Sequence, residues 1–112
     1  MTAHSRDEPV FMISVAARLC EMHPQTLRLY ERLGLVQPQR QNGRNRLYSQ
    51  EDIDRLLQIQ RLTQDLGVNL AGVEVILDLL ERLSQTRADA EERLEQMRLY
   101  YEREIERLRC GM

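Results

Sequence analysis

Two short stretches with the apolar spacing of helices follow a polar lead-in at 1–10, which we expect to be disordered. The first helix is predicted at 15–20, with Ser14 as its N-cap. The second is predicted to begin at Pro24, because proline suits the first turn of a helix, and to end at Gly34. The short turn between them predicts a helix-turn-helix.

The next stretch has the pattern of a β-hairpin. Residues 35–40 have an extended pattern, residues 45–48 form the return strand, and the Asn-Gly pair at 42–43 favours a tight turn between them. Arg44 follows that turn and Arg46 lies on the return strand. We therefore expect a small two-stranded wing that carries arginine at its tip and along its second strand.

A third helix is predicted after the wing. Ser49, with Asp52 three residues later, forms a variant of the capping box that marks a helix start. Gly67 is expected to end this helix. Its buried stripe is expected to consist of Ile53, Leu56, Leu57 and the residues from Ile59 to Leu66.

A last, long helix is predicted after Asn69, its expected N-cap, although weak helix formers at 84–86 allow a bend there. Its apolar residues recur at steps of three and four, which is the pattern of a coiled-coil seam. Because an isolated helix gains little stability from propensity alone, we expect this seam to pair with a second copy of the chain; the alternative is a helix folded back on its own domain. The predicted dimer interface consists of Leu83, Ala90, Leu94, Met97, Tyr101, Ile105 and Leu108.

The expected fold is therefore dominated by α-helices: a winged helix-turn-helix at 11–83, then a dimerisation helix and short tail at 84–112.

The charged residues are also distributed differently between the front and the rear of the chain. Every basic residue is arginine, and the net charge is −2. Residues 16–48 hold six arginines and two acids, a balance of +4, whereas residues 78–109 hold seven arginines and nine acids, a balance of −2. An anionic partner is therefore expected at the front of the chain.

Double-stranded DNA is the anionic partner that this arrangement suggests, because the second helix of a helix-turn-helix enters the major groove. Arg28 can contact guanine or bind a phosphate, Gln25 can read adenine, and Leu29 can lie against a thymine methyl group. Leu27, Tyr30 and Leu33 are expected to face inward. Arg44 and Arg46 of the wing are expected to meet the sugar-phosphate backbone or to enter an adjacent minor groove, and the hydroxyl of Tyr48 is expected to donate to a phosphate. The full candidate set is His23, Gln25, Thr26, Arg28, Leu29, Tyr30, Arg32, Arg44, Arg46 and Tyr48.

Other classes of function have little support. Cys20 and Cys110 lie far apart without neighbouring ligands, so we expect no metal site, and no cofactor motif is visible. His4 and His23 have no catalytic partners, which disfavours an enzyme. No apolar run reaches the length of about 20 residues that a membrane helix needs, and no signal peptide is visible, so we expect a cytoplasmic protein without a membrane partner. A protein-only coiled-coil adaptor is the remaining alternative class.

The sequence resembles the MerR-type transcriptional regulators. The resemblance is carried by the run Thr26–Leu35, by Pro38, by Gly43–Tyr48, and by Asp52 with Ile53 and Leu56. It implies a DNA-binding winged helix followed by a long helix that forms an antiparallel dimer coiled coil. By position, it also assigns Arg28, Tyr30, Arg46 and Tyr48 to the DNA-contacting motif.

Within that family, residues 22–26 and 69–73 resemble the HspR heat-shock repressor branch. This implies a homodimeric repressor of chaperone genes that binds an inverted-repeat operator in the nucleoid, with the DnaK chaperone as a candidate co-repressor. The nitrogen-regulating branch shares the Asn-Leu-Ala-Gly motif and is the nearest alternative. Metal-sensing members carry a cysteine where this sequence has residues 84–86, Ser-Gln-Thr, so we do not expect metal sensing, nor drug sensing through a separate ligand domain.

Overall fold

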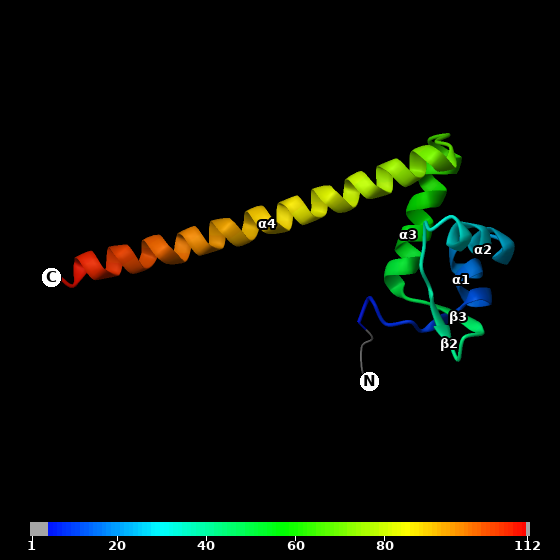
Figure 1. The fold of residues 1–112 in the computed structure, drawn as a ribbon, viewed down its shortest axis with the longest axis horizontal. Coiled ribbons are helices and arrows are strands. Elements are labelled where there is room, and N and C mark those ends of the chain that lie inside the picture. Colours follow the sequence, from blue (N-terminus) through cyan, green and yellow to red (C-terminus); the bar gives the residue numbers. More distant parts are fainter. Residues whose placement is uncertain (1–4, 112) are drawn as a thin grey trace. The chain divides into compact units, whose positions relative to one another are not determined.

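The computed structural model describes residues 5–111 and divides between Glu74 and Val75 into two compact units, which are described separately. The proposed disordered lead-in at 1–10 lies partly outside the described residues. The first unit contains the predicted helix-turn-helix, formed by α1 (Ile13–Cys20) and α2 (Pro24–Arg32) (Figure 1).

The two helices begin in different ways. Pro24 opens α2, and the Nδ1 atom of His23 accepts a hydrogen bond from the Gln25 amide at 3.0 Å. This confirms the predicted start, and Gly34 follows the helix with a φ of 77°, as a left-handed C-terminal residue requires. The predicted cap of α1 is wrong, because the helix begins at Ile13 and Ser14 lies inside its first turn.

The wing belongs to a three-stranded antiparallel sheet in the order β1-β3-β2, so the prediction of two strands misses one. The predicted hairpin is formed by β2 (Gln39–Gln41) and β3 (Asn45–Tyr48), with Arg40 opposite Arg46. The added strand β1 (Phe11–Met12) pairs with the other edge of β3, where Phe11 faces Tyr48. Two residues are too few to show an alternating pattern, but they cover an edge that would otherwise be unpaired.

The capping box of α3 (Gln50–Gln60) is confirmed, and a turn of π-helix (Arg61–Asp65) continues this helix. The hydroxyl of Ser49 accepts from the Asp52 amide at 3.1 Å, and the Asp52 carboxylate accepts from the Ser49 amide at 2.9 Å. The amides of Ser49 and Asp52, two of the backbone donors at the helix start, are thereby satisfied.

The core of the first unit lies between the helices and the sheet. Its largest fully buried side chains include Tyr48, Leu27, Leu56, Ile59 and Val36. Three residues predicted to be buried are exposed instead: Leu33 at 46%, Leu57 at 37% and Leu66 at 68%. Leu33 is the C-cap of α2. Leu57 comes directly after the buried Leu56 and therefore points to a different side of α3. Leu66 follows the π-helical turn, which shifts the direction of the side chains.

One continuous helix, α4 (Leu70–Arg109), forms the rest of the chain. The predicted cap is confirmed, since the Gly72 amide donates to the Asn69 side chain at 2.8 Å. The 40 residues of α4 correspond to a length of about 60 Å. No bend occurs at 84–86, so the boundary proposed after Leu83 falls inside a helix. Among the described residues, no helix is both long and apolar enough to span a membrane.

The two serines provide a matched test of capping. Ser49→Ala removes the hydroxyl that binds the Asp52 amide, and we expect it to lower the free energy of unfolding by about 1 kcal/mol. Ser14→Ala changes an exposed position inside α1 and should stay within about 0.5 kcal/mol of the parent. Denaturant titration of both variants measures the difference; equal losses would contradict the assignment of the caps.

Candidate DNA-binding surface

The helix α2 presents one side to solvent and buries the other. Leu27 and Tyr30 are buried, which confirms the inward face predicted for them. Tyr30 is only 8% exposed, so little of it is available to the DNA contact that the family resemblance assigns to it. The residues of α2 predicted to contact DNA that are exposed or half-buried are Gln25, Thr26, Arg28, Leu29 and Arg32.

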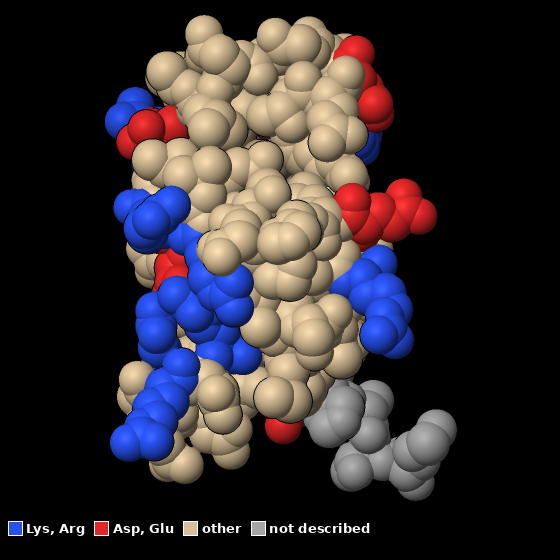
Figure 2. Space-filling model, turned by 90° about the vertical axis from the view of Figure 1, so that its right-hand side faces the viewer, with Lys and Arg blue, Asp and Glu red and all other residues tan. Residues whose placement is uncertain are grey.

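Arginine side chains gather in a band along one side of the face shown in Figure 2. Arg32 on α2 and Arg44 beside the wing tip are exposed, and Arg28 is half-buried. None of these three arginines makes an ion pair with a residue in the described range 5–111. Their guanidinium groups are therefore available to an anionic ligand, and arginine is well suited to bind phosphate or guanine through paired hydrogen bonds.

The other two arginines of the wing are held by Glu31 on α2. The carboxylate of Glu31 accepts hydrogen bonds from Arg46 and, at 3.2 and 3.4 Å, from Arg40. Glu31 and Arg46 are largely buried, with side-chain exposures of 18% and 20%. Like charges directly opposite each other on paired strands repel, so the single carboxylate of Glu31 offsets part of the repulsion between the facing Arg40 and Arg46 and ties both strands to α2.

This ion pair changes the position expected for Arg46. The sequence suggested that its guanidinium projects freely toward the sugar-phosphate backbone, but the structure places it on Glu31. Glu31 itself was missed, although a signal existed: it is the only acidic residue between Met22 and Gln50, a stretch that contains five arginines.

Tyr48 also lies elsewhere than expected. Its side chain is fully buried, and its hydroxyl has no hydrogen-bond partner among the described residues. Burial raises the pKa of Tyr48 to about 12, and the nearby charge of Glu31 adds to this effect. The expectation of an exposed hydroxyl that donates to a phosphate is therefore corrected: Tyr48 supports the wing from the core.

His23 has a structural role at the same surface. Its exposed side chain caps α2 through Nδ1, so a neutral His23 carries its proton on Nε2. A role in DNA contact would therefore use the Nε2 side of the ring.

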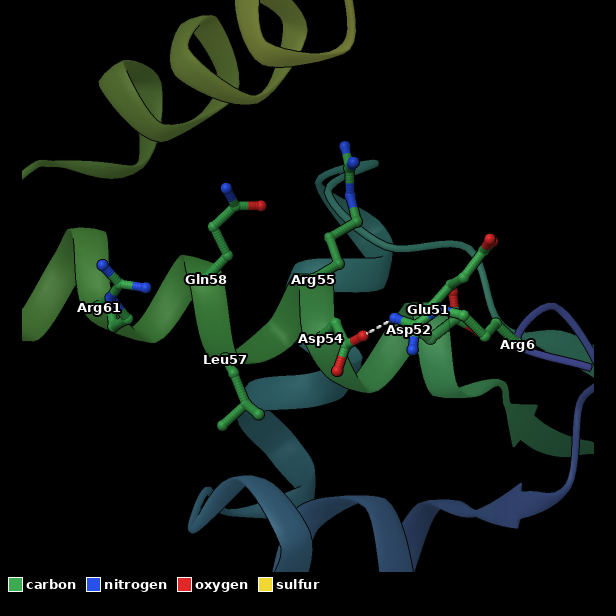
Figure 3. Close-up of a pocket in the computed structure, with 8 residues that line it drawn as sticks. All are labelled: Arg6, Glu51, Asp52, Asp54, Arg55, Leu57, Gln58 and Arg61. Atoms are coloured by element: carbon green, nitrogen blue, oxygen red, sulfur yellow. Dashed lines mark hydrogen bonds and ion pairs between the residues drawn. The ribbon is translucent and has the colours of Figure 1, made fainter. Parts of the chain in front are cut away.

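An open pocket on α3, which the sequence did not reveal, lies among charged side chains. Figure 3 shows Arg55 and Gln58 on one side of the helix and Leu57 on the other. Arg6 pairs with Asp54, and Arg55 donates to the Leu35 carbonyl, so two of the pocket's basic groups are already occupied. Within the described range, no group of three or more His, Cys, Asp or Glu residues could hold a metal ion.

The predicted dimer residues are exposed on α4 of the single chain. Leu94 and Leu108 are 65% and 68% exposed, and the other members are exposed as well. The described part of the chain therefore carries a long row of apolar side chains that nothing covers.

A helix-turn-helix with an arginine-bearing wing defines a winged-helix DNA-binding protein. Residues 11–80 match the model of the MerR HTH family regulatory protein, and the chain belongs to this family. Its members are transcriptional regulators and not enzymes.

Several curated relatives cover much of the chain. The "Putative heat shock protein HspR" of Streptomyces coelicolor is 52% identical over 88 residues, which is 79% of this chain and 58% of that protein. The regulator GlnR of Bacillus anthracis is 38% identical over 88 residues, 79% of this chain and 66% of its own length. The mercuric resistance operon regulatory protein of Bacillus cereus is 40% identical over 73 residues, 64% of this chain and 54% of its own. The chain thus spans between half and two thirds of these relatives.

Removing the charge of Glu31 tests its role between helix and wing. In Glu31→Gln, Arg40 and Arg46 face each other without a counter-charge, so the free energy of unfolding should fall by about 1–3 kcal/mol. Glu74→Gln removes one exposed acid from the same unit and should cost less than about 0.5 kcal/mol. If denaturant titration gives the same stability for both variants, the ion pairs do not hold the wing.

Proposed function

We propose that this MerR-family regulator is a homodimeric repressor of heat-shock (chaperone) genes that binds an inverted-repeat operator. One observation supports the DNA-binding part. The arginines on α2 and at the wing tip that form no ion pair lie on elements that Glu31 holds together, since it ties the wing to α2. The heat-shock assignment rests on the similarity to HspR at 52% identity. We place its action in the cytoplasm, on the nucleoid, with the DnaK chaperone as a candidate co-repressor.

The helix α2 and the wing make different kinds of contact with DNA. Arg28 and Gln25 on α2 read base edges, with Leu29 as an apolar contact, because this helix is the element that fits the major groove. Arg44 contacts the sugar-phosphate backbone from the wing tip, which positions the protein without reading sequence. A two-fold dimer presents each set twice, so the operator has two inverted half-sites.

A second candidate is a nitrogen-metabolism regulator, because the nitrogen-regulating branch of the family shares the Asn-Leu-Ala-Gly motif at 69–72. The two candidates differ in the genes beside the bound sites. Sequencing genomic fragments captured by the purified protein should recover sites upstream of chaperone genes. Recovery of sites beside nitrogen-assimilation genes instead would favour the second candidate.

Two arginine variants separate base reading from backbone contact. On a duplex selected from genomic DNA, Arg28→Ala should cost roughly 1–3 kcal/mol per half-site and reduce the preference over scrambled DNA. Arg44→Ala should weaken binding to both duplexes equally and lower the salt slope by about one unit per half-site. Titrations at several salt concentrations measure both effects, and identical behaviour of the two variants would refute the division of roles.

The homodimer is tested at the centre of the seam. The chain should sediment as a dimer at micromolar concentration, and Leu94→Asp should separate it, because a carboxylate buried without a partner costs several kcal/mol. Leu99→Asp is the matched control, since Leu99 lies about 140° around the helix from Leu94. A monomeric parent chain, or dimers of equal strength in both variants, would contradict the proposed interface.

A further inference from the structure

Two charged residues interrupt the apolar row of α4. Steps of four and three from Leu83 reach Arg87, Ala90, Leu94, Met97, Tyr101, Glu104 and Leu108, while Ile105 of the predicted interface follows Glu104 at the edge of this row. Arg87 is exposed and forms no ion pair with another described residue, whereas Glu104 pairs only with its neighbour Arg107 at 2.8 Å. An arginine and a glutamate inside a seam are costly when their charges are buried unpaired, so their positions restrict how a second copy can fit.

Within the antiparallel pairing that the family resemblance implies, we propose that the two copies meet on this row in one register, with Arg87 of each copy facing Glu104 of the other. This inference rests on the proposed homodimer. The two-fold axis then crosses α4 between Glu95 and Gln96. Each residue of the row faces the residue of the second copy that lies equally far from this axis in the opposite direction along the sequence. Leu94 faces Met97 and Leu83 faces Leu108 across the interface.

The same register matches side chains by size. Ala90, the smallest residue of the row, faces Tyr101, the largest, so the tyrosine ring fills space that two alanines would leave empty. Large residues opposite small ones are the arrangement that packs a core without voids. Tyr101 is 56% exposed in the single chain, and this contact would cover it.

Other arrangements place the two charges badly. A parallel pair puts Arg87 against Arg87 and Glu104 against Glu104, so like charges meet twice in the interface. Moving one copy of the antiparallel pair by one heptad puts Glu104 opposite Leu80 or Leu94 and leaves both charges unpaired. Burying an unpaired charge costs far more than a surface ion pair contributes, so these registers are disfavoured.

Residues beside the row agree with this arrangement. In an antiparallel pair in this register, Glu91 lies beside Arg98 of the second copy, which adds an attractive contact on each side of the axis. A parallel pair would bring Arg93 beside Arg98 and add repulsion. The guanidinium of Arg98 already donates to the carboxylates of Glu95 and Glu102, each at 2.5 Å. These hydrogen bonds use only part of its five N–H donors, so the group can also accommodate Glu91.

Exchange of the two charges tests the register in the full-length chain. Arg87→Glu and Glu104→Arg each put like charges together twice, and we expect each to weaken the dimer at least tenfold. The double variant Arg87→Glu/Glu104→Arg restores opposite charges only when residue 87 faces residue 104, and its dimerisation constant should return to within about threefold of the parent. Analytical ultracentrifugation over a range of concentrations measures all four proteins.

The controls reverse the same charges outside the row. Glu92→Arg and Arg103→Glu should leave the dimer within about threefold of the parent, because both positions lie on the far side of the helix. A dimeric parent whose double variant is as weak as the single variants would overturn the register and leave the homodimer standing. Single variants that dimerise like the parent would also overturn it. A monomeric parent would refute the homodimer itself, and the register with it.

Discussion

The ion pairs between Glu31 and the wing are the interaction on which the rest of the recognition surface depends. α2 carries the residues that can read bases, the wing carries those that can meet phosphate, and no single element fixes both. One largely buried carboxylate joins α2 to β2 and β3 by accepting from Arg40 and Arg46. The buried ring of Tyr48 supports the same strand from the core side. A wing held in this way is aligned before DNA arrives, so binding need not include the cost of ordering it.

The same interactions limit how strongly the protein binds DNA of any sequence. Two of the six arginines in residues 16–48 share the carboxylate of Glu31, and the whole chain has a net charge of −2. The electrostatic attraction that brings a basic protein to any duplex is therefore modest, and affinity must come from a few correct contacts. This requirement connects the recognition surface to the uncovered row on α4, because the proposed dimer would make each of these contacts twice. In the proposed antiparallel register, the charges of Arg87 and Glu104 likewise determine how the two copies align.

Local signals in the sequence predicted most of the fold. Pro24, Gly34, Ser49 with Asp52, and Asn69 mark helix ends through contacts within a few residues, and the structure confirms each of them. The features that were missed depend on residues distant in the chain. The strand at Phe11 exists only because it pairs with β3, and Tyr48 is buried because helices cover it. The contact between Arg46 and Glu31 joins residues fifteen positions apart on different elements, so arginine clustering suggested a surface but could not identify the partner of each arginine.

The central claim is that two identical reading surfaces act together on one duplex. Its most direct test is a selection of duplexes from a random pool by the purified full-length chain at physiological salt, followed by sequencing. The account predicts enrichment of one motif made of two inverted half-sites at a fixed spacing. It would be contradicted by enrichment of a single half-site without symmetry, or by binding that enriches no sequence.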